Sequence, residues 1–406
     1  MKRKHLFVAL SRSGWGETSL GVEVARQVCN AGDTVSFIAH SGSVPALSGT
    51  GYEVREVSEE TGPLINLLFE DCLAHDNFAS IILSDFLTTN YTLQAFGVDP
   101  TFLLRCQMPV ITLDTWQYDL TGSVVDVVGV AQWQIGTWIE QVPRRLVPVP
   151  IGQPTASGAY RNLPSPLKIT ADMRHHIRRN LGVKDGEWAV LFCTAIWQQG
   201  LKHPNSLRSI AALPQLLWHY LREVDSAVRL IHVGPAALPI DPADERYLWM
   251  PAVAPDDFDR LLGSVDLVLS ANIAATTIGR AIAVGVPVLV VQNSYAVATV
   301  EEAEAKAGPA VSPAVRKWLE QALPLYPFNM WPLGFREFLK PLLRDNPYCS
   351  AIDVVELMDE AGFVGTCRRL LFDAGARAAV RERQAAYVAR VKQLPTAAQL
   401  IDNYLQ

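Results

Sequence analysis

The sequence predicts an α/β protein built from two doubly wound parallel sheets and a helical C-terminal segment. Short apolar runs alternate with segments of helical spacing in both halves of the chain, a pattern that favours mainly parallel sheets. A proline-rich stretch at residues 145–167 separates the two halves and predicts a linker. The chain has 406 residues, of which 49% are hydrophobic. That length is sufficient for two cores of ordinary size.

The first half begins with an apolar strand expected at residues 5–10 and a helix expected at 17–30. Leu20, Val24 and Val28 follow helical spacing, and Gly32 ends the segment. The same reading predicts strands at 34–39, 52–57, 79–84, 109–113 and 124–129, and helices at 62–75 and 91–97.

The second half repeats the alternation after a helix expected at 170–181. Strands are expected at 189–193, 228–233, 247–250, 266–270 and 288–291, with helices at 205–222, 255–263 and 275–284. We therefore predict an N-terminal domain at 1–150, a second domain at 165–320 and a mostly helical extension at 321–406.

Composition excludes several classes of protein. The formal net charge is −6 and no dense run of Lys and Arg occurs, which argues against nucleic acid as the partner. The six cysteines lack a C-x-x-C spacing and suit a reducing cytoplasm. No stretch has the length of a membrane span. We expect no metal site, because the histidines show no zinc-ligand spacing and His175 and His176 are adjacent.

Candidate site residues follow from one topological rule. Ligands of doubly wound sheets bind beyond the carboxyl ends of the strands, in a cleft if two such sheets face each other. In the first half the rule selects the loop Ser13, Gly14, Trp15, Gly16 and Glu17, the pair Ser84 and Asp85, and Asp114 with Thr115 and Trp116. In the second half it selects residues 194–198, Gly234, residues 251–253, residues 270–277 and the pair Gln292 and Asn293. The donor-site candidates among them are Thr194, Trp197, Gly234, Ser270, Asn272, Thr276 and Thr277. Trp197 fits either stacking on a nucleotide base or a place in the core.

The segment 266–293 carries the most informative pattern, because it contains a strand, a polar turn, a helix and a second strand. Small or hydroxylated residues from Ser270 to Thr277 stand where the helix must begin. The N–H groups and the dipole of a helix N-terminus favour a phosphate. An ordinary βαβ unit without a ligand remains the alternative.

This segment resembles the nucleotide-sugar site of GT-B glycosyltransferases. Gly285-Val286-Pro287 matches the Gly-x-Pro of that family, and the spacing then puts Thr277 at its Thr position and Ala274 at a usual Gly. Arg280 stands where the family has a Glu that commonly binds the donor ribose. We expect Arg280 to contact an anionic ligand group or an acidic neighbour instead.

The N-terminal loop adds a second resemblance to the same family. Aligning Ala25 and Gly32 with the family pattern places Glu17 where a loop His often serves as base or contacts the acceptor. Glu17 is therefore the first candidate base, and Asp114 is a second candidate or an orienting partner. The alternatives are that Glu17 is a helix N-terminal residue and that Asp114 caps a turn.

The resemblance implies a GT-B architecture, in which two Rossmann-like domains face a cleft and part of the C-terminal segment crosses back to the first domain. It implies a cytoplasmic glycosyltransferase that uses a nucleotide-sugar donor, a small-molecule acceptor and no bound cofactor, with a homo-oligomer left open. One alternative is a GT-B-shaped enzyme of other chemistry, such as a sugar-nucleotide epimerase or a transferase of a non-sugar group. The other is an inactive homologue that binds a partner protein.

Overall fold

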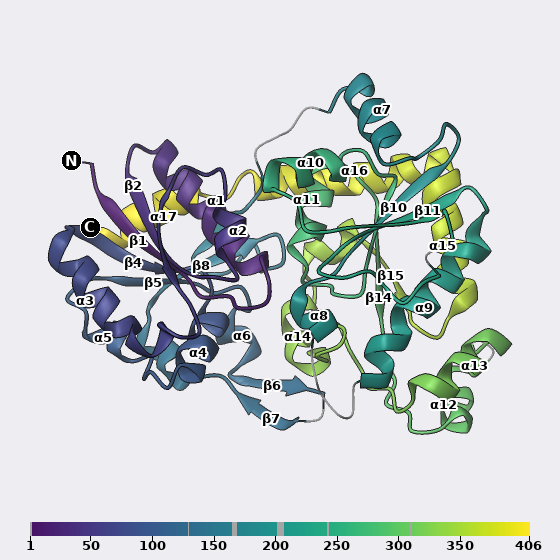
Figure 1. Ribbon diagram of the computed structural model, residues 1–406, viewed down its shortest axis with the longest axis horizontal. Helices are drawn as coiled ribbons and strands as arrows, with labels where there is room; N and C mark the ends of the chain where they lie inside the picture. Colours follow the sequence, from purple (N-terminus) through teal and green to yellow (C-terminus); the bar gives the residue numbers. More distant parts are fainter. Residues whose placement is uncertain (1, 129, 165–168, 201–206, 242, 309–310) are drawn as a thin grey trace. The chain divides into compact units, whose positions relative to one another are not determined.

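The computed structural model describes residues 2–128, 130–164, 169–200, 207–241, 243–308 and 311–406. Contacts divide the chain into two compact units. Unit 1 contains residues 1–124, 134–164 and 389–406, and unit 2 contains residues 125–133 and 165–388. Each unit is built around one parallel sheet, as the sequence predicts (Figure 1).

Unit 1 contains a seven-stranded parallel sheet in the order β3-β2-β1-β4-β5-β8-β9. Its strands are β1 (Lys4–Ala9), β2 (Thr34–His40), β3 (Glu53–Val57), β4 (Phe78–Leu83), β5 (Val110–Leu113), β8 (Arg144–Val149) and β9 (Ala159–Arg161). Its helices are α1 (Gly16–Asn30), α2 (Val44–Leu47), η1 (Gly62–Leu64), α3 (Ile65–His75), α4 (Phe86–Ala95), α5 (Phe102–Arg105), α6 (Tyr118–Thr121), η2 (Thr137–Gln141) and α17 (Ala397–Leu405).

The core of unit 1 lies between the sheet and its helices. Phe7 and Phe37 stack at 5.0 Å on neighbouring strands, and Val24 and Ala25 of α1 are fully buried in the same cluster. The C-terminal helix α17 packs on α1 and contributes Ile401 to this core.

Unit 2 contains a six-stranded parallel sheet in the order β12-β11-β10-β13-β14-β15. Its strands are β10 (Trp188–Cys193), β11 (Val228–Val233), β12 (Tyr247–Met250), β13 (Leu267–Ser270), β14 (Val288–Gln292) and β15 (Asp353–Glu356). Its helices are α7 (Ala171–Asn180), α8 (Ile196–Gly200), α9 (Leu207–Val224), α10 (Pro255–Leu262), α11 (Thr276–Val284), α12 (Val300–Ala307), α13 (Pro313–Ala322), α14 (Arg336–Leu343), η4 (Pro347–Ala351) and α15 (Glu360–Phe372). Helix α16 (Ala374–Val391) begins in unit 2 and ends in unit 1.

Three sequence expectations were wrong in detail. The expected linker contains the strands β8 and β9. Proline has no backbone N–H, and a strand tolerates it at positions where that N–H would not bond to a neighbouring strand. The strand expected at 124–129 does not join the first sheet, since β6 (Val124–Val127) pairs only with β7 (Val130–Gln134). The helix expected at 91–97 begins earlier, at Phe86, because the Asp85 carboxylate caps it.

The described helices include none with both the length and the hydrophobicity to cross a membrane.

Candidate functional site

The strand order of unit 1 reverses between β1 and β4. From β1 the sheet continues to β2 and β3, and from β4 it continues to β5 and β8. The loops that leave two such strands turn to opposite faces of the sheet, and the space beyond their carboxyl ends is the usual ligand site of doubly wound folds. The loop before Glu17 follows β1 and Asp85 follows β4, so both carboxylates lie at this reversal.

A glycine contact brings Glu17 toward Asp85. A Cβ atom on Gly21 of α1 would lie 2.2 Å from Ser84 Oγ, so only glycine lets α1 approach the end of β4 this closely. Glu17 precedes Gly21 by one helical turn and therefore lies on the same face of α1. Asp85 comes directly after Ser84. The two carboxylates consequently lie near enough for the charge of Glu17 to act on Asp85.

Both carboxyl groups bind protons more tightly than exposed carboxyl groups do. Burial raises the pKa of Glu17, whose Oε2 accepts a hydrogen bond from Ser11 Oγ at 3.4 Å. Burial and then the negative charge of Glu17 raise the pKa of Asp85 to about 7. Asp85 is 2% exposed, and its Oδ2 accepts a hydrogen bond from Thr88 N at 2.8 Å. The raised pKa of Asp85 suits a group that exchanges protons near neutral pH.

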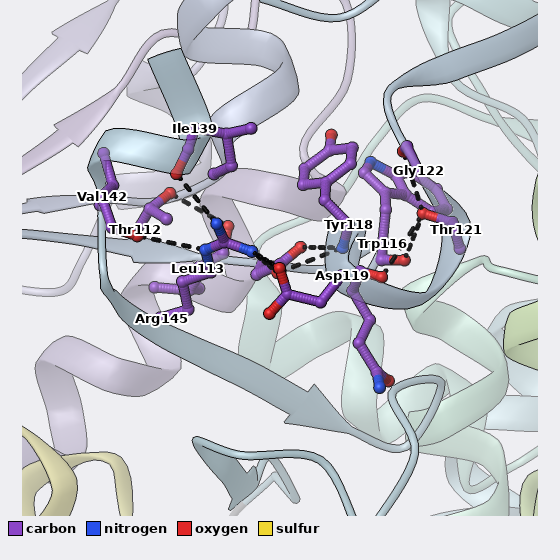
Figure 2. Close-up of polar contacts among 12 residues, drawn as sticks. Thr112, Leu113, Trp116, Tyr118, Asp119, Thr121, Gly122, Ile139, Val142 and Arg145 are labelled. Atoms are coloured by element: carbon purple, nitrogen blue, oxygen red, sulfur yellow. Dashed lines mark hydrogen bonds and ion pairs between the residues drawn. The ribbon is translucent and has the colours of Figure 1, made fainter. Parts of the chain in front are cut away.

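Asp114 lies in a turn that is closed by its own carboxylate. The two carboxylate oxygens accept from Tyr118 N at 3.2 and 3.3 Å, which is the turn-capping geometry. Asp114 is 1% exposed and its pKa is raised to about 6 by burial. Its Oδ2 lies 3.7 Å from Arg145 Nη1, and that nitrogen donates to Asp119 Oδ1 at 2.6 Å. Figure 2 shows the Arg145 guanidinium against Asp119 and the carbonyl oxygen of Ile139.

The other predicted residues of unit 1 differ in exposure and in their contacts. Gly16 is the first residue of α1, and Ser13 and Trp15 before it are partly exposed while Gly14 is buried. Trp15 Nε1 donates to Gly42 O at 3.0 Å. Trp116 is only 5% exposed and therefore contributes to packing. An acceptor-side role for these five residues stays a prediction.

The strand order of unit 2 reverses between β10 and β13. Thr194 and Trp197 follow β10, and Ser270 to Thr277 follow β13, so the predicted donor residues flank this reversal. The Thr277 side chain lies beside the buried thiol of Cys193 at the end of β10. The two turns are therefore adjacent within unit 2.

The turn after β13 is shaped by its own side chains. Ser270 Oγ accepts from Asn272 N at 3.1 Å and donates to Asn272 O at 2.9 Å, and Asn272 Oδ1 accepts from Ala274 N at 2.9 Å. Ser270 and Asn272 are buried, so they fix the turn. Helix α11 then begins after Ala275, which offers no capping side chain. A helix start of this kind favours an anion beside the partly exposed Thr276 and Thr277.

Thr194, His232 and Gly234 form a close-packed group at the ends of β10 and β11. Thr194 Oγ1 lies 2.8 Å from His232 Nε2 and accepts from Gln199 Nε2 at 3.1 Å. A Cβ atom on Gly234 would lie 2.3 Å from Thr194 Oγ1, so the position requires glycine. Burial lowers the pKa of His232 to about 4, which keeps its imidazole neutral. Trp197, in α8, is partly exposed.

Arg280 contacts an acidic neighbour. Its Nη2 donates to Asp259 Oδ2 at 3.1 Å, and its Nε lies 3.1 Å from Asp259 Oδ1. The guanidinium also lies 5.9 Å from the centroid of the Phe258 ring. This two-point contact ties α11 to α10. A donor-binding role for Arg280 stays a prediction.

The sequence analysis assigned no role to two polar residues of the sites, Asp85 and Arg336. The strand-end rule selected Asp85, but its raised pKa depends on the packing of Gly21, which the sequence alone does not reveal. Arg336 was not selected at all, because it begins α14, far along the chain from the strand whose end it contacts. The described ranges contain no group of three or more His, Cys, Asp or Glu residues that could hold a metal ion.

Comparison with solved structures gives the same fold class. A structure of the spinosyn rhamnosyltransferase SpnG has a TM-score of 0.51 at 13% identity, covering 98% of each chain. A structure of a UDP-N-acetylglucosamine 2-epimerase from Listeria monocytogenes has a TM-score of 0.50 at 9% identity, covering 98% of this chain and 92% of the other. The HepE protein of Anabaena, crystallised with UDP and glucose, has a TM-score of 0.49 at 16% identity, covering 99% of each chain.

The two Rossmann-like units and the similarity to SpnG define a GT-B-like fold. The chain belongs to the family of unknown function DUF6365, whose family model matches residues 24–406. No curated protein matches the sequence.

Proposed function

We propose that the protein is a glycosyltransferase that moves a sugar from a nucleotide-sugar donor to a small-molecule acceptor. The observation that carries this proposal is the uncapped start of α11, which lies at the strand-order reversal of unit 2 beside Thr276 and Thr277. Backbone N–H groups there can receive the donor phosphates, and the threonine hydroxyls can add hydrogen bonds. HepE, a protein of similar fold, was crystallised with UDP and glucose.

In the proposed reaction, unit 1 supplies the base that takes the proton of the acceptor. In transfer, an acceptor oxygen forms the new bond to the sugar, the bond from sugar to phosphate breaks, and the acceptor proton must go to a base. We assign Glu17 as that base and Asp85 as a positioning residue whose charge state adjusts the proton affinity of Glu17. Asp114 is the second candidate base, although its turn-capping contacts already use both carboxylate oxygens.

The first experiment is a thermal-shift comparison of UDP, TDP, GDP and CMP, each with and without an attached sugar. A ligand that binds only the folded protein raises the melting temperature, so one nucleotide class should stabilise the protein. Absence of a shift with every nucleotide would contradict the proposal and favour a partner-binding protein.

A sugar-nucleotide epimerase is the second candidate. A similar structure is described as such an epimerase, and the paired carboxyl groups Glu17 and Asp85 could remove and return a proton. NMR of the products separates the two reactions. Transfer predicts that release of nucleoside diphosphate depends on the acceptor, whereas epimerisation predicts a changed sugar that is still attached to its nucleotide. We further propose a cytoplasmic location, which the six unpaired cysteines support.

A further inference from the structure

Arg336 is held at the carboxyl end of β14 by three neutral side chains. Its Nη1 donates to Gln292 Oε1 at 2.8 Å and to Asn329 Oδ1 at 2.7 Å, and its Nη2 donates to Ser294 Oγ at 2.7 Å. Arg336 is partly buried, while Ser294 is exposed. The guanidinium is therefore fixed in position with one side toward solvent.

The charge of this guanidinium is not neutralised by an ion pair. Within the described ranges, no carboxylate oxygen lies within 4.0 Å of its nitrogen atoms. The nearby carboxylate of Glu356 accepts from Ser294 N at 2.9 Å, from Ser294 Oγ at 2.6 Å and from Gln292 Nε2 at 2.8 Å, so it contacts Arg336 only through these two residues. The carboxylate of Asp126 accepts from the backbone N–H groups of Arg336, Glu337 and Phe338 at the start of α14.

Donor groups of Arg336 remain for a ligand. Arginine carries five N–H groups, and the three hydrogen bonds above use both hydrogens of Nη1 and one of Nη2. The Nε–H group and the second Nη2–H group have no acceptor among the described residues. A guanidinium with spare donors and no paired carboxylate favours a phosphate-like anion.

Arg336 also lies near the turn proposed to receive the donor phosphates. Asn329, which holds its guanidinium, accepts at its backbone oxygen from Ile273 N at 2.9 Å, and Ile273 belongs to the turn between β13 and α11. Gln292 ends β14, the strand paired with β13. All of these residues belong to unit 2.

We propose that Arg336, and not Arg280, is the cation that binds the diphosphate of the nucleotide-sugar. This assignment rests on the proposed function. Arg280 stands at the matching position of the sequence motif, but its guanidinium already has a two-point contact with Asp259. Arg336 reaches the same end of the sheet from a segment outside that motif and has its charge available.

The test measures binding of inorganic pyrophosphate and of UDP, TDP and GDP by titration calorimetry. Arg336→Gln should lower the affinity for pyrophosphate and for the nucleotide that binds by about 10- to 100-fold, since it removes charge-assisted hydrogen bonds. Asn329→Asp should produce a similar loss because its new carboxylate would pair with Arg336 while the side-chain shape is kept. Thermal unfolding confirms that each variant is folded.

Arg368→Gln is the matched control. It removes the same charge from an exposed arginine of unit 2 whose guanidinium donates to the backbone oxygens of Val224 and Glu223. Its affinity should equal that of the wild type. Equal binding by the wild type and both Arg336-directed variants would overturn the assignment while leaving the proposed function intact. If pyrophosphate binds but none of the three nucleotides does, the Arg336 anion site is retained and the nucleotide-sugar function is rejected. Absence of binding to all four probes would overturn both.

Discussion

The guanidinium of Arg280 and the carboxylate of Asp259 meet at two points, with both nitrogen–oxygen distances at 3.1 Å. The pair joins two neighbouring helices of unit 2, α10 and α11, and both side chains are about four-fifths buried. Arg280 therefore helps to fix the helix whose start is the proposed phosphate site.

A double-mutant cycle on this pair should show coupling. Arg280→Gln and Asp259→Asn should each lower the free energy of unfolding, and the double variant should lose about 1 kcal/mol less than the sum of the two, because the interaction is lost only once. Denaturant unfolding provides the four values. Strict additivity would show that the ion pair contributes nothing to stability.

Glu17→Gln should lower turnover by roughly 100- to 10,000-fold while leaving nucleotide affinity unchanged, since the proposed base acts on the acceptor. The measurement is turnover with the donor found by thermal shift, together with calorimetric affinity for its nucleotide. Glu23→Gln is a matched control on the same helix and should retain activity. Near-normal turnover of Glu17→Gln would move the base to Asp114, and near-normal turnover of both single variants would argue against transfer.

Asp85→Asn should change how stability depends on pH. The pKa of Asp85 in the folded protein is about 7, above the usual value of an unfolded chain, so the folded state binds more protons between pH 4 and 7. The wild type therefore loses stability as pH rises through this window. The change in the free energy of unfolding caused by Asp85→Asn should therefore be more favourable at pH 8 than at pH 4, by on the order of 2 to 4 kcal/mol.

Unfolding curves of the wild type and of Asp85→Asn at pH 4 and pH 8 check this expectation. Asparagine can still accept the hydrogen bond from Thr88 N and cap α4, so the helix should be kept. An identical pH dependence in both proteins would show that Asp85 ionises normally.

Thr277→Val should weaken binding of the nucleotide by about 2- to 10-fold, the effect of one lost hydrogen bond, without unfolding the protein. Thr366→Val makes the same change at a partly exposed position within α15 and should bind normally. Calorimetric titration compares the two variants with the wild type. Equal affinity for all three would remove Thr277 from the proposed phosphate site.

Gly234→Ala should destabilise unit 2 by about 1 to 3 kcal/mol, because its new methyl group would collide with Thr194 Oγ1 and His232 Nε2. Gly365→Ala is the counterpart, since a Cβ atom at this exposed position of α15 meets nothing within 4 Å. It should stabilise the helix by about 0.5 to 1 kcal/mol. Thermal unfolding measures both changes, and a neutral Gly234→Ala would contradict the close packing of this group.

The central strands could be predicted from the sequence because a buried parallel strand needs an apolar run, as at Leu267–Ser270 and Val288–Gln292. Two edge strands, β9 and β15, could not be predicted, whereas the edge strands β3 and β12 match the strands expected at 52–57 and 247–250. Ala159–Arg161 has three residues, and Asp353–Glu356 has only two apolar residues, Val354 and Val355, within a segment expected to be mostly helical. Each is paired on one side only, so its composition is less constrained.

The positions of the site residues relative to the strands could be predicted better than their contacts with other side chains. The strand-end rule selects Glu17, Asp85 and Thr277 because each follows a strand in the chain. The contact of Arg280 with Asp259 and the position of Arg336 depend on how separate helices pack, which local sequence patterns do not encode.

The packing of α17 on α1 affects the order in which the protein can fold during synthesis. Unit 1 includes both the first 124 residues and the last 18, and Ile401 belongs to the same buried cluster as Leu20 and Val24. While the ribosome is still translating unit 2, the apolar face of α1 has no cover from α17. Unit 2 can fold from residues that are already made, whereas this face of α1 stays uncovered until α17 has been synthesised.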